Sequence, residues 1–465
     1  MLKDLFKKYI YPIAVFSGGM IGVGFLSLPY IAMQTGIWLM FLYFLVITAL
    51  IVVINLIFCQ ICLKTPDFKR FPGFVGHYLG KWAEFFTMVL TILGTFGVLL
   101  IYLLIGSQFL TSVFQPLFSG SELTYVLIYF FVVSIIIYFD IKVIARVEFW
   151  VITLLFLSLL LAFIEGFSHI KLSNIFIQNH IGFNNFFLPY GPLLFALWGI
   201  GLIPEVEEML GGRDANQNYF SGSELRQDSR REERADASAH HERRSNEEYC
   251  LNSPARREIK KWLIPVLPLL DALNLNASSR RRALKSSHFL TSKTNSGLHP
   301  VPLGKKKQLK NIITISTIII SFFYLLFVFL ILGITGKQTD QSALTGLKNF
   351  LGDGVVTISL LLGALATFTA FITQGIIFKK TLMFDLKIKH WQAFVMTCFP
   401  PLILFLIGLK SFIPLISFIG GIVLGIDGIL ILLMYKKIGG KNIIIFPLSM
   451  VFLLGVIYEI IYFIK

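Results

Sequence analysis

Charged residues are scarce in this chain of 465 residues, at 14% against 55% hydrophobic residues. Ordinary soluble domains carry about 25% charged residues, and the mean hydropathy here is +0.76. This composition excludes an ordinary soluble protein. Cysteine is also scarce, with four residues at Cys59, Cys62, Cys250 and Cys398. No second cysteine pair accompanies Cys59 and Cys62, so we expect neither a zinc site nor a disulfide framework. No residue is therefore assigned as a metal ligand.

The motifs of intramembrane enzymes are also missing. No H-E-x-x-H helix and no G-x-S-x-G turn occurs. An aspartyl protease needs two facing membrane aspartates, and only Asp427 lies deep in an apolar segment. No repeated selectivity-filter segment indicates a channel. We therefore expect no enzyme, and an intramembrane enzyme stays a weaker alternative.

Long apolar runs dominate the chain instead. A membrane span needs roughly 20 mostly apolar residues, and eleven segments are interpreted as spans. They cover residues 11–34, 37–63, 82–114, 124–139, 147–166, 188–210, 311–334, 354–378, 391–408, 412–435 and 443–464. The first run continues past Pro29 without a small-residue cleavage site, so it is interpreted as a span and not a signal peptide.

Lysine and arginine are concentrated in every second loop between the predicted spans. Cytoplasmic loops carry these residues, and the pattern places the amino terminus inside and the carboxyl terminus outside a cell (plasma or inner) membrane. The net charge of +15 then follows from this bias, which attracts anionic lipid. We expect no nucleic-acid partner and no obligate protein partner.

Residues 213–304 differ from the rest, because they are rich in arginine, serine and glutamate. Such charge runs are typical of disorder, and an inserted cytoplasmic segment is favoured over a folded regulatory domain. The predicted organisation is a first repeat with span six at 1–212, the insertion at 213–304, and spans seven to eleven at 305–465.

Glycine interrupts two of the apolar segments. The first reads Ser17-Gly18-Gly19-Met20-Ile21-Gly22-Val23-Gly24, and the second Ala196-Leu197-Trp198-Gly199-Ile200-Gly201. In hydrocarbon every backbone polar group must be paired, so a broken span is tolerated only where it faces protein, solute or water. Two broken spans at corresponding places of two halves indicate a transporter's binding site.

Spans one to five and spans six to ten each begin with a broken span. Because each set has an odd number of spans, the second set enters the membrane from the opposite side. The predicted fold is an all-α polytopic membrane protein with 11 transmembrane helices. Its helices form a 5+5 inverted repeat plus one, with helices 1 and 6 broken.

The stretches Gly18 to Tyr30 and Phe195 to Val206 resemble the first-span and sixth-span signatures of the amino acid/auxin permeases and aromatic amino acid permeases. Phe399-Pro400-Pro401 and the run from Gly420 to Tyr435 are similar to bacterial members. The resemblance covers nearly everything except 213–304. It implies the amino acid–polyamine–organocation superfamily, the leucine-transporter fold, and secondary transport of amino acids.

The breaks supply groups that suit a zwitterion. Amides from Ile21 to Gly24 lie at the positive end of a half-helix and would bind a carboxylate. The ammonium group would face backbone carbonyls near Ser17 to Gly19 in the first break and, across the site, near Ala196 and Leu197 in the second. The predicted binding residues are Ser17, Gly18, Gly19, Ile21, Gly22, Val23, Gly24, Ala196, Leu197, Trp198, Gly199 and Gly201. The alternative for the glycines is close helix packing.

The coupling ion, Na⁺ or H⁺, is left open with a slight preference for H⁺, and no other cofactor is expected. Glu205 and Asp427 are candidate carriers or gating residues. The resemblance places a sodium-binding hydroxyl at Thr369, but Ala370 stands where a second is expected, and Thr367 could compensate. Both threonines could instead bond their own helix. Glu207 and Glu208 are expected as solvated carboxylates at the cytoplasmic end of their span. Glu84 and Glu459 lie nearer span ends and are expected to reach solvent from there.

We predict a permease for a neutral, aromatic or branched amino acid. A non-transporting amino acid sensor of the same fold stays open as the alternative.

Overall fold

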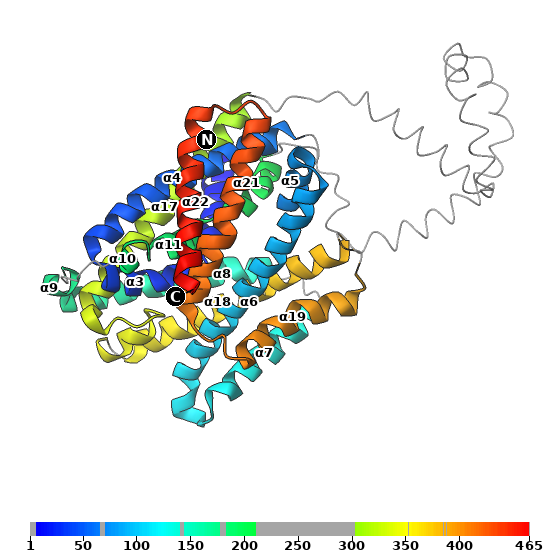
Figure 1. The fold of residues 1–465 in the computed structure, drawn as a ribbon. Helices are drawn as coiled ribbons and strands as arrows, with labels where there is room; N and C mark the ends of the chain where they lie inside the picture. The colour runs from blue at the N-terminus through cyan, green and yellow to red at the C-terminus, as the bar shows by residue number, and fades with distance from the viewer. Residues whose placement is uncertain are drawn as a thin grey trace, which may run out of the picture. The chain divides into compact units, whose positions relative to one another are not determined.

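The computed structural model describes residues 6–65, 70–139, 144–176, 183–210, 303–351, 353–384, 386 and 388–464. They belong to one compact unit (Figure 1). Within these ranges the regular structure is helical and no β-strand occurs. Residues 213–302 of the predicted insertion lie outside the described residues. The division of the chain at 212 and 305 therefore stays a prediction.

The first part of the chain holds three helices of 23 to 38 residues and several shorter ones. They are a π-helical turn at Phe6–Ile10, α2 (Tyr11–Met20), η2 (Val23–Ser27), α3 (Leu28–Thr35), α4 (Ile37–Lys64), α5 (Phe71–Leu79), α6 (Lys81–Phe118), α7 (Glu122–Tyr138), α8 (Ile144–Gly166), η3 (Phe167–His169), α9 (Leu172–Ile175), α10 (Phe183–Phe186), α11 (Tyr190–Leu197), η4 (Ile200–Leu202) and α12 (Ile203–Met209).

The second part begins with α17, a helix of 33 residues. Its elements are α17 (Leu303–Thr335), η6 (Gly336–Gln338), η7 (Thr345–Asn349), α18 (Asp353–Phe384), α19 (His390–Leu406), α20 (Phe412–Ser417), η8 (Phe418–Val423), α21 (Leu424–Lys437) and α22 (Asn442–Ile464). The six residues of η8 form a π-helical turn between α20 and α21.

Six described helices are long and apolar enough to cross a membrane, and a bent pair, Lys8–Met20 with Val23–Thr35, makes a seventh candidate. Four shorter apolar helices run from Glu122 to Tyr138, Thr153 to His169, Tyr190 to Leu202 and His390 to Leu406. All eleven predicted segments therefore coincide with helix. The number of crossings stays a prediction, because only seven candidates reach membrane length.

Outward-facing side chains fit a lipid surrounding. Phe131 on α7 and Leu453 on α22 are more than half exposed, at 58% and 51%. Large apolar side chains in contact with water are unusual over wide surfaces of soluble proteins. Together with the apolar helices they support a multi-pass membrane protein.

Two hydrophobic cores and a small third cluster of Phe378, Leu382 and Ala393 hold the helices together. The larger core joins side chains of α2, η2, α4, α11 and α17, with Phe16 and Ile54 fully buried. The smaller core joins α6, α7, α18 and α19 through residues such as Leu99, Phe371 and Cys398. α4 packs on α17, α6 on α18, and α7 on α19. α21 and α22 lie side by side (Figure 1).

Candidate functional site

The first predicted break is present. α2 ends at Met20, and the chain is extended at Ile21 (φ −79°, ψ 98°) and Gly22 (φ −113°, ψ −172°) before η2 begins at Val23. The helices before and after the break differ in direction by 55°. Among the described residues, no backbone carbonyl accepts from the N–H of Gly22. This N–H lies at a helix start, where the first amides have no acceptor within their own helix.

The second break follows the same pattern. α11 ends at Leu197, Trp198 is extended (φ −73°, ψ 114°), and Gly199 (φ −124°, ψ 12°) leads into η4 and α12. Both breaks therefore lie where the glycines of the sequence placed them.

The two breaks are in direct contact with each other. A methyl group added at Gly24 would lie 2.7 Å from Phe195 Cδ1 and 3.2 Å from the Cα of Ala196. One added at Gly199 would lie 3.1 Å from the Met20 side chain. Because these glycines have neighbours at less than a normal carbon contact, they allow the close approach of the two broken helices.

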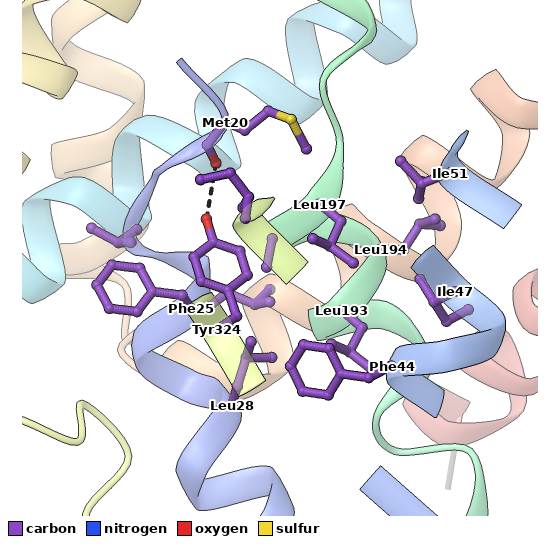
Figure 2. Packing of buried hydrophobic residues seen from close by; sticks show 14 of the residues in the cluster. Met20, Phe25, Leu28, Phe44, Ile47, Ile51, Leu193, Leu194, Leu197 and Tyr324 are labelled. Atoms are coloured by element: carbon purple, nitrogen blue, oxygen red, sulfur yellow. Dashed lines mark hydrogen bonds between the residues drawn. The ribbon is translucent and has the colours of Figure 1, made fainter. Parts of the chain in front are cut away.

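A buried tyrosine supplies one hydrogen bond at the first break. The hydroxyl of Tyr324 on α17 donates to the carbonyl of Met20 at 3.2 Å (Figure 2). Tyr324 is fully buried. Met20 is the last residue of α2, so its carbonyl lacks a helical donor, and Tyr324 supplies one.

Aromatic rings surround the residue that follows the break. Phe25 stacks on Tyr324 with ring centroids 5.4 Å apart and an interplanar angle of 6°. It meets Phe327 edge to face at 4.9 Å. Such pairs stabilise a core beyond the area they bury, so Phe25 is held firmly beside the break.

A small cavity of about 30 Å³ opens at the first break. A cavity of this size holds no more than a few water molecules. It is lined by Ile21, Gly22, Val23, Phe25, Leu26, Tyr102, Leu155, Leu344, Gly363, Ala366, Thr367 and Ala370. Its polar groups include the hydroxyls of Tyr102 and Thr367, and the rest of the lining is mostly apolar.

The predicted binding residues divide into two groups. Ile21, Gly22 and Val23 line the cavity. The others do not line it, and several of these pack against the opposite break or lie in the larger core. This second group comprises Ser17, Gly18, Gly19, Gly24, Ala196, Leu197, Trp198, Gly199 and Gly201. A methyl group at Gly19 would lie 2.7 Å from the Leu202 side chain, whereas one at Gly18 or Gly201 would meet no atom within 4 Å.

The predicted coupling residues are spread over the fold. Thr367 lines the cavity, and its hydroxyl donates to the carbonyl of Ala364 at 2.8 Å. Thr369 donates to the carbonyl of Ala366 at 3.0 Å, so both threonines bond their own helix. Asp427 on α21 is partly buried, and its Oδ1 has no hydrogen-bond partner among the described residues. The side chain of Glu205 lies outside the described part of the chain.

Two carboxylates expected at solvated span ends are buried. Glu459 is 1% exposed and Glu207 is 5% exposed. That expectation was wrong because neighbouring helices cover these ends, which hydropathy along one segment does not show. The side chain of Glu208 is outside the described residues. Tyr324 and Tyr102 were also missed, and the only available signal was a tyrosine in the middle of an apolar run.

Comparison with known families adds an independent line of evidence. Residues 6–225 match the tryptophan/tyrosine permease family. No curated protein is significantly similar to the chain. The matched part contains both breaks and every cavity-lining residue of the first half of the chain. The match supports an amino acid transporter, and with the apolar helices it supports a multi-pass membrane permease.

Proposed function

We propose that this protein is a secondary active transporter that moves a neutral, aromatic or branched amino acid across the cell membrane by alternating access. The observation that carries the proposal is the direct contact of two glycine-broken helices beside a cavity. Unwound backbone in a membrane protein is tolerated where it binds a solute or packs in protein. The family match supports the same solute class.

The amides at the first break are suited to the substrate carboxylate. The N–H groups of Gly22 and Val23 lie at the cavity, at the start of the helical run formed by η2 and α3. Helix starts attract anions through unpaired N–H groups and the helix dipole. The hydroxyls of Tyr102 and Thr367 offer further hydrogen bonds.

Aromatic substrates are favoured by the composition of the lining. Phe25 and Tyr102 contribute rings, and Leu26, Leu155 and Leu344 contribute apolar surface. Ligand pockets enclose roughly 300–1,000 Å³, so a cavity of about 30 Å³ has to enlarge to admit an amino acid. Movement of the broken helices relative to α6 and α18 would provide this space.

Helix contacts support the predicted inverted repeat. If spans one to five correspond to spans six to ten, α4 corresponds to α17, α6 to α18, and α7 to α19. The contact of α11 with α4 then has a counterpart in that of α2 with α17, and the contact of α6 with α7 has one in that of α18 with α19. Eleven crossings, a cytoplasmic amino terminus and an external carboxyl terminus complete the proposed topology.

Coupling to H⁺ or Na⁺ belongs to the same proposal. Ala370 lines the cavity where a second hydroxyl would serve Na⁺, and both Thr367 and Thr369 bond their own helix. A hard cation prefers several oxygen ligands, so this lining favours H⁺.

Uptake into proteoliposomes tests the proposal. Purified protein is reconstituted, and labelled tyrosine, tryptophan, leucine and alanine are offered with an imposed proton or sodium gradient. We expect saturable accumulation of an aromatic or branched amino acid, dependent on one gradient. Binding that saturates without accumulation would favour a sensor of the same fold instead.

A further inference from the structure

Glu459 is a buried carboxyl group that the proposed substrate site does not use. It lies on α22, the last helix, which stands outside the predicted 5+5 repeat. Its side chain is 1% exposed, and its Oε2 has no hydrogen-bond partner among the described residues. An acidic group enclosed in this way is costly and is rarely kept in a membrane protein without a function.

Two glycines, one on α11 and one on η8, make room for this carboxyl group. A methyl group added at Gly191, on α11, would lie 2.7 Å from Glu459 Oε1, and also 2.9 Å from the carbonyl oxygen of Ser417. One added at Gly421, on η8, would collide with Glu459 Cγ. The carboxyl group therefore sits at the junction of α11, η8 and α22.

The junction joins the second broken helix to a π-helical turn. A methyl group at Gly420 would collide with the carbonyl oxygen of Gly191, so the backbones of η8 and α11 touch. A π-helical turn departs from regular α-helical hydrogen bonding and is frequent at functional sites. Separation of α11 from η8 would therefore open the surroundings of Glu459 directly.

No cation among the described residues faces Glu459 at this junction. α11 contributes Tyr190, which is 3% exposed and lies against Gly455 of α22, one helical turn before Glu459. α22 itself contributes Tyr458 and, one turn on, Tyr462. η8 carries no titratable residue. The nearest acidic residue after η8 along the chain is Asp427 on α21. It lies six residues after Gly421, which is about 9 Å along a helix axis at 1.5 Å per residue.

We propose that Glu459 is a proton-binding site that couples proton movement to the separation of α11 from η8. The proposal rests on the proposed transport function. While the two backbones touch, an ionised carboxylate would be an unpaired charge in an apolar surrounding, so the neutral acid is favoured. When they separate, water reaches the group, its O–H bond breaks, and the proton passes to water. The carboxylate takes up a proton again from water before the junction closes.

Transport by Glu459→Gln in proteoliposomes tests the coupling. Glutamine keeps the size of the side chain and is neutral, as the protonated acid is. We expect exchange of labelled for unlabelled substrate to remain. Accumulation driven by a proton gradient should fall to the level seen without a gradient. The matched control is Glu122→Gln, an exposed carboxyl group at the start of α7, which should accumulate substrate as the wild type does.

The outcomes separate the two proposals. If wild type and Glu459→Gln accumulate substrate equally in a proton gradient, Glu459 is not the coupling site, and the transport function stands. If the wild type is driven by sodium alone, proton coupling at Glu459 is overturned. If the wild type neither exchanges nor accumulates any amino acid, both proposals fall.

Infrared spectroscopy supplies a readout that does not depend on transport. A protonated carboxyl group has a carbonyl band distinct from that of a carboxylate. We expect detergent-solubilised wild type to show such a band at neutral pH that Glu459→Gln lacks and Glu122→Gln retains. Identical spectra of wild type and Glu459→Gln would contradict a protonated Glu459. Size-exclusion profiles of all three proteins establish that the variants are folded.

Discussion

Gly22 and Gly199 occupy corresponding places in the two breaks but meet different neighbours. A methyl group at Gly22 would lie 3.5 Å from the Tyr102 hydroxyl, an ordinary contact at the edge of the cavity. One at Gly199 would lie 3.1 Å from Met20 and 3.2 Å from Phe16. At the residue scale, Gly22 therefore borders the cavity, whereas Gly199 keeps space for the opposite helix.

Replacement of Gly22 tests this assignment. Gly22→Leu should abolish uptake, because its side chain would fill a cavity of about 30 Å³, while membrane insertion stays normal. Gly22→Ala should retain most uptake, because the backbone at Gly22 is extended and its neighbour is at contact distance. Initial uptake rates per amount of reconstituted protein measure both. Unchanged uptake by Gly22→Leu would refute the site. We expect Gly199→Leu to abolish uptake too, with a lower melting temperature.

Tyr324 is the residue whose loss should affect the first break most specifically. Tyr324→Phe keeps the ring that stacks on Phe25 but leaves the buried Met20 carbonyl without its donor. An unpaired buried polar group costs about 1–3 kcal/mol, and we expect the melting temperature in detergent to fall accordingly. Tyr11→Phe, at an exposed tyrosine of α2, is the control and should melt as the wild type does. An equal melting temperature for Tyr324→Phe would show that the bond contributes nothing.

At the element scale, a buried lysine joins the end of one helix to another. Lys379 on α18 is fully buried. Its Nζ donates to the carbonyl of Ile137 at 2.5 Å and to that of Tyr138 at 3.4 Å, and it lies 3.4 Å from His390 Nε2. Both carbonyls lie at the carboxyl end of α7. A cation is favoured there because the last carbonyls of a helix lack helical donors and the helix dipole is negative at that end. Lys379 thus attaches α7 to α18.

Lys379→Met should release the end of α7. Methionine keeps much of the apolar length but cannot donate a hydrogen bond. We expect the free energy of unfolding to fall by about 1.5–3 kcal/mol, the usual contribution of a hydrogen bond to a charged group. Hydrogen exchange should accelerate over the last turn of α7. Lys380→Met, at the next and partly exposed position, should leave exchange unchanged. Equal exchange in both variants would contradict this role of Lys379.

At the scale of the whole molecule, the two parts of the sequence that flank 213–304 build one compact unit. α12 ends at Met209 and α17 begins at Leu303, and these two helices contact each other. A short link between them is therefore compatible with the fold.

Deletion of residues 214–304 tests whether the predicted insertion is needed. We expect membrane insertion and amino acid uptake comparable to those of the full chain, because joining Gly212 and Lys305 gives a short basic loop. Uptake and membrane content are measured together in cells that express either form. Normal insertion with lost transport would assign the segment a regulatory role.

The sequence by itself determined the helical class and the position of both breaks. Apolar runs of membrane length have to be helical because backbone groups must be paired in lipid, and glycine clusters mark where a helix can stop. The order of the chain was therefore enough to place Gly22 and Gly199 outside regular helix. It was also enough to predict that Thr369 could bond its own helix, because that bond is local.

Only the tertiary structure decided which groups meet across helices. Tyr324 lies about 300 residues from Met20, and Glu459 is buried by α11 and η8, so neither role follows from hydropathy along one segment. The same reason separates the predicted binding residues that line the cavity from those that pack. Spacing along the chain fixes which residues are close on one helix, whereas the packing of several helices decides which of them reach a shared space.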